Sequence, residues 1–272
     1  MRQNPSFAMT DVAELRRMID ANPWMTLVSQ GEAGLVASHY AVLLDEERDD
    51  LTIVSHVGKP DDAILGLGER ELLVIVQGPH GYISPGWYGD EPAVPTWNFV
   101  SVHLSGVPEI LSPDENLRVL ERLVARFEGA MPQPRLMWQP PNDEEYVRRL
   151  ERGTVGFRLT PTKVVAKRKL SQNRPDEVVD TIIAELEAGG SPYADPRLPA
   201  EMRRAHESIR AARRAAVSTP APAPGAAPES AAVPAPEAAS VAAGSPRRAP
   251  ELLQSALEPP ETAGSEQFGV RS

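Results

Sequence analysis

The stretch TWNFVSVHLSG, which runs from Thr96 to Gly106, decides the class of fold. From Val100 onward its apolar residues alternate with polar ones, which is the period of a strand that buries one face. The entrance to this strand carries Trp97 and Asn98, which offer an aromatic face and an amide with both a donor and an acceptor. Such groups at a strand mouth predict a flat polar ligand or a contact between subunits. A capped strand with a core Trp is the alternative.

The segments on either side predict a meander of strands with helices at its ends. Strands are expected at 24–29, 35–44, 51–56, 72–77, 97–111, 154–160 and 163–170, the last two as a hairpin, and helices at 11–22, 60–66, 113–127, 143–150 and 175–186. This order favours a small antiparallel barrel over a parallel sheet with crossover helices. The predicted fold class is therefore mostly β with flanking α.

Residues 78–95, between two of these strands, are predicted to form a long ordered loop. Eighteen residues without secondary structure are uncommon in a compact domain and usually carry function. The segment contains Tyr82, Trp87 and Tyr88, which is not the composition of a disordered chain. We therefore expect this loop to cover a site.

Composition divides the chain into three parts. Residues 1–190 are expected to form the folded domain, and residues 191–217 an Arg-rich helix or linker. Residues 218–272 are rich in Ala and Pro and have one aromatic residue, so they bury too little apolar surface to fold and are predicted to be disordered.

The formal net charge of −10 argues against a nucleic-acid-binding body. Only the arginines within 197–214 offer a footprint for nucleic acid, and a solvated basic helix is the favoured interpretation of that stretch. Direct nucleic-acid binding is thus disfavoured and is expected, if anywhere, through 197–214.

The absence of cysteine excludes disulfides, a thiol nucleophile and thiolate metal ligands. The sequence has no signal-peptide pattern at its start and no run of 18 apolar residues. It also has no His/Glu spacing typical of a metal site, no Walker loop and no nucleophile elbow. We expect a cytoplasmic protein with no bound metal and no membrane partner.

Residues 55–60, SHVGKP, contain the parts of a phosphate site. A strand ends there, a helix begins, a glycine permits close approach, and Lys59 supplies a positive charge. Asp61 and Asp62 follow directly and would repel an anion, so an ordinary strand-to-helix turn is the alternative.

Two further stretches carry hydrogen-bonding side chains. Ser38 and His39 lie in an expected strand, where they would contact a ligand or belong to the core. The hexad KLSQNR at 169–174 has five polar side chains at a strand end. That is more than a turn requires, so a ligand or dimer contact is favoured over a solvated loop.

Taken together, these motifs resemble the PaiB-type family of FMN-binding negative transcriptional regulators, which are related to the flavin split barrels. The resemblance spans about residues 1–190 and rests on the order of ASH (37–39), SHVGK (55–59), QGPHGYISPGWY (77–88), VPTWNF (94–99) and KLSQNR (169–174). It implies a split β-barrel that forms a homodimer, with FMN between the subunits.

The resemblance also implies a set of cofactor-binding residues. Ser38, His39, Ser55 and His56 would border the flavin, Lys59 would meet its phosphate, Trp97 and Asn98 would lie near the ring system, and Lys169, Ser171 and Gln172 would close the pocket, from the same chain or its partner. Lys59 stands where the family usually has Arg, which keeps the charge but loses the bidentate fork.

Three functions follow from this resemblance. The first is a regulatory protein that acts through bound flavin or a protein partner, because no helix-turn-helix is identifiable. The second is a flavin-dependent oxidoreductase that uses FMN and NAD(P)H, with His80 and Tyr82 as substrate contacts. The third is a split barrel that has lost its cofactor.

Overall fold

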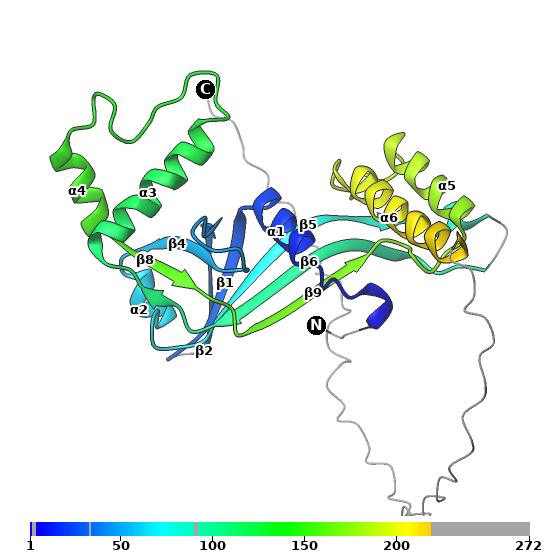
Figure 1. Ribbon diagram of the computed structural model, residues 1–272, viewed down its shortest axis with the longest axis horizontal. Helices are drawn as coiled ribbons and strands as arrows, with labels where there is room; N and C mark the ends of the chain where they lie inside the picture. Colours follow the sequence, from blue (N-terminus) through cyan, green and yellow to red (C-terminus); the bar gives the residue numbers. More distant parts are fainter. Residues whose placement is uncertain (2–3, 33, 90–91, 219–272) are drawn as a thin grey trace, which may run out of the picture. The chain divides into compact units, whose positions relative to one another are not determined.

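Two antiparallel sheets form the centre of the fold (Figure 1). The computed structural model describes residues 1, 4–32, 34–89 and 92–218. The first sheet has the order β2-β1-β5-β6-β9, and its strands are β1 (Trp24–Gly31), β2 (Gly34–Ala41), β5 (Leu72–Ile83), β6 (Thr96–Gly106) and β9 (Lys163–Lys169). The second has the order β3-β4-β8-β7, formed by β3 (Leu43–Leu44), β4 (Ile53–Gly58), β8 (Thr154–Leu159) and β7 (Glu109–Ile110). The predicted fold class, an antiparallel split barrel with flanking helices, is confirmed.

The core lies between the two sheets, as the alternation in β6 predicts. Val100, Val102 and Leu104 are at most 1% exposed. They belong to one apolar cluster with Phe157 and Leu159 of the second sheet. Since side chains alternate across a strand, the polar residues of β6 between them point away from this core.

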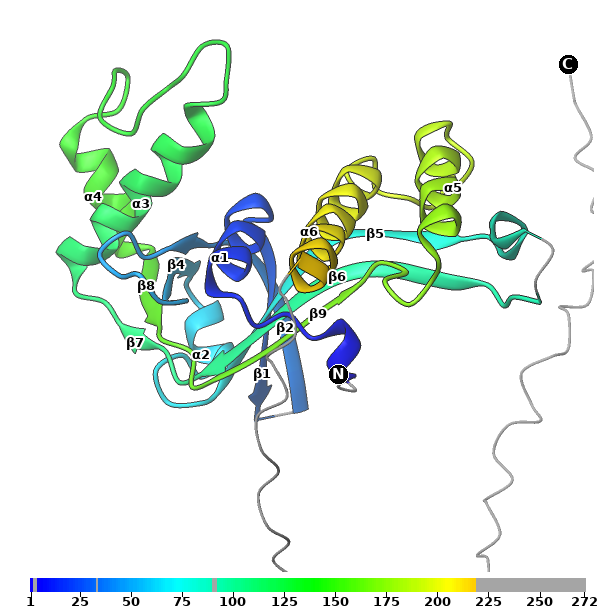
Figure 2. The ribbon, with the colours of Figure 1, turned by 45° about the vertical axis from the view of Figure 1, so that its right-hand side comes forward.

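Helices flank the sheets at the positions that the sequence predicts, with small shifts of their ends. They are α1 (Val12–Ala21), α2 (Asp61–Leu65), α3 (Pro113–Glu128), α4 (Glu144–Arg152), α5 (Asp176–Glu187) and α6 (Leu198–Ser218), with short 3₁₀ turns η1 (Pro5–Phe7) and η2 (Pro85–Tyr88). Asp11 caps α1, and Ser112 with Glu115 forms the capping box of α3. Figures 1 and 2 show α5 and α6 over the part of β5 and β6 that extends beyond β1.

The predicted loop over 78–95 is largely wrong, because β5 continues to Ile83 and η2 follows soon after. Gly78 and Gly81 lie within this strand, and atoms of other residues pack directly against both positions. A Cβ on Gly78 would lie 2.7 Å from the sulfur of Met18, and one on Gly81 would lie 2.8 Å from atoms of Ala194 and Leu198. These glycines therefore permit close packing. Residues 90 and 91 of the predicted loop lie outside the described residues.

The predicted hairpin over 154–170 is also wrong. β8 pairs with β4 and β7, whereas β9 pairs with β6 in the other sheet. The chain changes sheets between them close to Gly106, where an added Cβ would lie 3.1 Å from both Leu159 and Thr160. The predicted strand over 97–111 divides at the same corner into β6 and β7.

The folded unit extends past the predicted boundary at 190. The described residues up to 218 belong to one compact unit, in which α6 buries Leu198, Met202 and Ala205 completely. The Arg-rich segment is therefore a packed helix and not a linker. The predicted disordered tail over 218–272 lies, except for Ser218, outside the described residues.

Four of the six arginines of 197–214 are engaged with carboxylates. Arg197 pairs with Asp195, Arg203 with Glu187, Arg204 with Glu14 and Arg210 with Asp176 and Asp180. Within the part of the chain that the structure describes, no helix has the length and apolar character needed to cross a bilayer.

Candidate functional site

The first group of predicted site residues surrounds the start of α2. Ser38 Oγ and Tyr40 Oη both donate to Oδ2 of Asp61, at 3.0 and 2.8 Å. The same Tyr40 oxygen accepts the N–H of Gly58 at 3.1 Å. Burial and the hydrogen bond to Asp61 raise the pKa of Tyr40 above its ordinary value. The carboxylate of Asp61, at the start of α2, thus binds two hydroxyl groups of β2.

His56 stands beside this group with an unused ring nitrogen. Its Nδ1 is buried without a hydrogen-bond partner among the described residues, and its ring meets that of Tyr40 edge-on at 6.1 Å. Burial lowers the pKa of His56, so the neutral imidazole is favoured. A buried nitrogen without a partner is costly, and a ligand atom would satisfy it.

Ser55 is a core residue, whereas His39 lies at the surface. Ser55 is completely buried, and its hydroxyl donates to the carbonyl of Ala41 at 2.6 Å, so it ties two strands together. His39 is exposed and stacks on Trp24, with ring centroids 6.3 Å apart.

Lys59 is already engaged where a phosphate was predicted. Its Nζ donates to the carbonyl of Arg152 at 2.9 Å, at the end of α4, where a positive charge is favoured by the helix dipole. The carboxylate of Asp61 lies two residues further on and holds the hydroxyls that an anion would need. Lys59 thus has one of its three N–H donors engaged beside a carboxylate, and its contact with a flavin phosphate stays a prediction.

The second group lies where β5 and β9 end and β6 begins, and it presents exposed aromatic rings. Trp97 is 46% exposed; His80 stacks on it at 6.4 Å and Tyr82 meets it edge-on at 6.2 Å. Tyr193, which is 66% exposed, adds a further ring to this cluster and meets Tyr82 edge-on at 6.5 Å. An open aromatic face of this kind fits a flat ring system such as that of a flavin.

Asn98 and Ser171 form a buried pair behind these rings. The Asn98 amide donates to Ser171 Oγ at 3.0 Å, and this hydroxyl also lies 3.2 Å from Asn98 Oδ1. Ser171 has φ of 64°, and among the described residues no other non-glycine has positive φ. Strained backbone of this kind persists where its surroundings hold it.

Gln172 and His206 supply that restraint. Gln172 bridges the turn, because its Oε1 accepts the N–H of Leu170 at 2.6 Å while its Nε2 donates to the carbonyl of Arg168. His206 of α6 lies 2.9 Å from the carbonyl of Leu170. Gln172 therefore shapes the turn.

Lys169 lies beside the pair and lines a small cavity. Its Nζ donates to Thr96 Oγ1 and to the carbonyl of Trp97, the latter at 3.0 Å. Burial, with a smaller contribution from the positive charge of Lys167, lowers the pKa of Lys169. The cavity measures about 230 Å³ and is also lined by Asn98 and Ser171.

The two groups lie apart within one chain. The sheet register aligns Ser38 with Leu27, Leu27 with Val74 and Val74 with Leu104. Leu104 is six residues along β6 from Asn98, which is about 20 Å at the rise of a strand. The structure thus brings Ser38, His56 and Lys59 together at one place, and Trp97, Asn98, Lys169, Ser171 and Gln172 at another.

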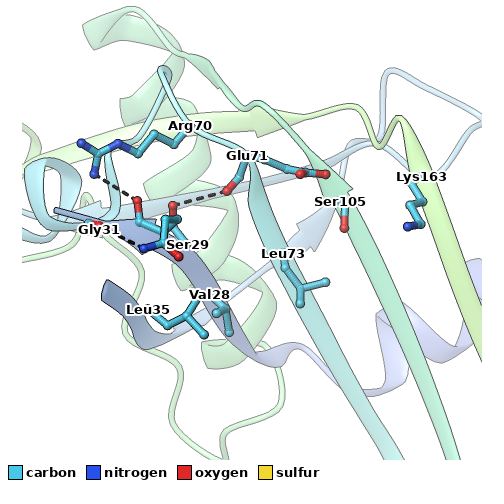
Figure 3. Close-up of a pocket in the computed structure, with 10 residues that line it drawn as sticks. Val28, Ser29, Gly31, Leu35, Arg70, Glu71, Leu73, Ser105 and Lys163 are labelled. Atoms are coloured by element: carbon cyan, nitrogen blue, oxygen red, sulfur yellow. Dashed lines mark hydrogen bonds between the residues drawn. The ribbon is translucent and has the colours of Figure 1, made fainter. Parts of the chain in front are cut away.

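The largest cavity among those described contains none of the predicted residues. It measures about 700 Å³ and lies at the other end of the first sheet, beside Ser29, Arg70 and Lys163 (Figure 3). Arg70 is used there to bind the carbonyl of Gln30 at 3.1 Å. No group of reactive side chains gathers among the residues that line it, so we do not assign the site to this cavity.

Sequence reasoning missed Tyr40 and Tyr193, and it interpreted Asp61 as an acid at a helix N-terminus that would repel an anion. Tyr40 follows directly on the ASH motif, and strand alternation places it on the same face as Ser38, which was a usable signal. Tyr193 gave no such signal, because it lies far along the chain from Tyr82, the ring that it meets.

Comparison with known proteins gives a family match over most of the folded unit. A family model described as "Putative FMN-binding domain" matches residues 1–163. The protease synthase and sporulation protein PAI 2 of Bacillus subtilis is 30% identical over 190 residues, which cover 69% of this chain and 90% of that protein. An uncharacterised protein of Saccharomyces cerevisiae is 28% identical over 37% of this chain and 64% of its own.

Solved structures resemble the chain more distantly. The FAD- and haem-binding protein from Mycobacterium smegmatis superposes with a TM-score of 0.46 at 17% identity, covering 65% of this chain and 78% of that one. The family match over residues 1–163 supports a flavin as the cofactor.

Proposed function

Because the chain belongs to the FMN-binding domain family that matches residues 1–163, we propose that it binds FMN as a homodimer and acts as a regulatory protein. The observation that carries the proposal is the open aromatic cluster at Trp97. An indole that is 46% exposed and flanked by two further rings costs free energy in water, and a flat ring system would cover it.

The separation of the two residue groups supports a homodimer. Within one chain, Asn98, next to Trp97, lies about 20 Å along β6 from Leu104, the residue that the sheet register aligns with Ser38. A second copy that brings its Trp97 group to Ser38 and His56 of the first would complete each site. The exposed Trp24 (65%) and Leu35 (78%) offer apolar surface to such a copy.

The regulatory role is proposed from the relationship to the Bacillus protein, which is named a protease synthase and sporulation protein. Regulation would act through the bound flavin or a protein partner. Four arginines of 197–214, the stretch considered for nucleic acid, are already paired with carboxylates, which weakens any attraction to a phosphate backbone.

The test is a flavin titration with the mass measured in parallel. The full chain is titrated with FMN while flavin fluorescence is followed, and light scattering gives the mass with and without FMN. We expect saturable binding at one FMN per chain and the mass of a dimer. A monomer that ignores FMN would overturn the proposal, and steady oxidation of NAD(P)H by the FMN-loaded protein would replace regulation with catalysis.

A further inference from the structure

We propose that the cavity between η2 and the end of β9 is an anion site that takes a phosphate or carboxylate group. We call it the Arg174 pocket; Tyr88, Thr96, Lys169, Asn173 and Arg174 are the lining residues that the argument uses. None of the nine described residues that line it is acidic. The two positive charges of Lys169 and Arg174 therefore share this cavity with no lining carboxylate.

Arg174 is held in position with its guanidinium unpaired. Its carbon Cζ lies 4.7 Å from the ring centroid of Tyr88, which is 6% exposed and therefore a fixed platform. No carboxylate of a described residue lies within ion-pair distance of Arg174, and Asp176, two residues on, pairs with Arg210. Its five N–H donors thus remain for an oxyanion.

Lys169 faces the same cavity with donor capacity left. Two of its three N–H bonds are directed to Thr96 and to the carbonyl of Trp97. Its pKa is lowered by burial and by the charge of Lys167, so an anion in the cavity would favour the charged form.

The turn that connects these two cations is built before any ligand binds. Ser171 is held at positive φ by its bond to Asn98, and Gln172 bridges the turn from within. The exposed Asn173 makes no side-chain hydrogen bond to a described residue, so its amide adds a neutral donor beside Arg174. Groups that are fixed in advance lose little entropy on binding.

The volume sets the size of the bound group. At about 230 Å³ the pocket is smaller than the roughly 300–1,000 Å³ of sites for drug-sized molecules. It therefore admits a phosphate or carboxylate with a small body but not a whole flavin. The anion is either the phosphate of the proposed FMN or that of a separate small acid.

The test compares the wild type with Arg174→Gln, which removes the charge but keeps an amide. Arg135→Gln is the matched control, because Arg135 is exposed and has no ion pair among the described residues. Calorimetry on the full chain measures the binding of inorganic phosphate, and fluorescence measures the affinities for FMN and for riboflavin, which lacks the phosphate.

We expect Arg174→Gln to weaken an anion contact by about 10- to 100-fold, since hydrogen bonds to charged groups have that strength. A loss of phosphate binding with the FMN-over-riboflavin preference unchanged assigns the pocket to a separate acid. A loss of that preference assigns it to the phosphate of FMN. Phosphate binding that is absent or unaltered, together with an unchanged preference, overturns the proposal.

Failure of the proposed function would be seen separately. If the chain binds neither flavin, the proposed cofactor is wrong, while the phosphate titration still decides whether the Arg174 pocket is an anion site. The melting temperature of Arg174→Gln is expected to lie at most a few degrees below that of Arg135→Gln (about 2–4 °C per kcal/mol), because among the described residues it loses no salt bridge and only the contact with the Tyr88 ring.

Discussion

Replacing Gly81 with Ala tests how closely the segment before α6 and α6 itself approach the strand that carries the aromatic cluster. The added Cβ would lie 2.8 Å from Cβ of Ala194 and from Cδ2 of Leu198, and 2.9 Å from Cα of Ala194. Ordinary contacts begin near 3.4 Å, so the neighbours must move by at least about 0.6 Å. The N–H of Asp195 donates to the carbonyl of His80 at 2.8 Å, which resists that movement.

The expected cost follows from two opposing effects. Overpacking a close contact costs about 1–3 kcal/mol, while replacing Gly by Ala restricts the unfolded chain and returns about 0.4–1 kcal/mol. We expect Gly81→Ala to lower the free energy of unfolding by about 1–2 kcal/mol. For a unit of this size that is a fall in melting temperature of roughly 2–8 °C.

Thermal and urea unfolding, followed by circular dichroism, measure this change. The control is Gly86→Ala, where the nearest heavy atom to an added Cβ is Ser84 Oγ at 3.5 Å, and no loss is expected. In the double variant Gly81→Ala/Leu198→Ala, the loss of unfolding free energy should be smaller than the sum of the losses in the two single variants. The reason is that the Cδ2 atom of Leu198, which collides with the added Cβ, is absent. Equal stability of Gly81→Ala and Gly86→Ala would refute the close approach.

Three further predictions concern the site residues. The pKa of His56 is lowered in the folded protein, so the unfolded chain takes up the proton first as the pH falls. The free energy of unfolding should therefore decrease as the pH drops below about 6.5, the ordinary pKa of histidine. In His56→Gln, the decrease between pH 7 and pH 5, measured by urea unfolding, should be smaller. Trp97→Ala should weaken FMN binding about tenfold in a fluorescence titration, because a stacked ring contributes up to about 1.5 kcal/mol. Ser171→Ala should lower the free energy of unfolding by about 1–3 kcal/mol, since it removes the hydroxyl that the buried Asn98 amide binds and leaves its Nδ2 only the sulfur of Met202, at 3.5 Å.

Each of these has a matched comparison. The His56 reasoning fails if His56→Gln loses as much stability between pH 7 and pH 5 as the wild type does. Trp138, 44% exposed, lies between α3 and α4, and its Ala variant should bind FMN normally. Ser171→Gly should cost less than Ser171→Ala, because glycine tolerates the positive φ; the reverse order would contradict the strain.

Local pattern was sufficient for most strands and helices. The alternation in β6, the cap at Asp11 and the capping box at Ser112 each depend on residues within one element, so the sequence predicts them directly. The motifs around Ser38, His56, Trp97 and Lys169 were likewise visible as unusual groups of polar and aromatic residues.

Tertiary contacts decided what those motifs do. Lys59 was predicted to hold a phosphate, yet its ammonium binds the carbonyl of Arg152, 93 residues away. Asn98 and Ser171 were selected separately, and only the fold makes them one pair across 73 residues. Such pairings cannot be read from a sequence because they depend on which segments the core brings together.

The sequence by itself thus determined most of the elements, the antiparallel class and most of the residues with chemistry to offer. The tertiary structure alone decided that β8 and β9 join different sheets, that Gly81 is a packing position, and that Arg174 faces a cavity unpaired. The physical reason is the separation along the chain of the residues that interact. Strand period and helix caps depend on neighbours along the chain, whereas close packing and charge pairing depend on residues that meet only after folding.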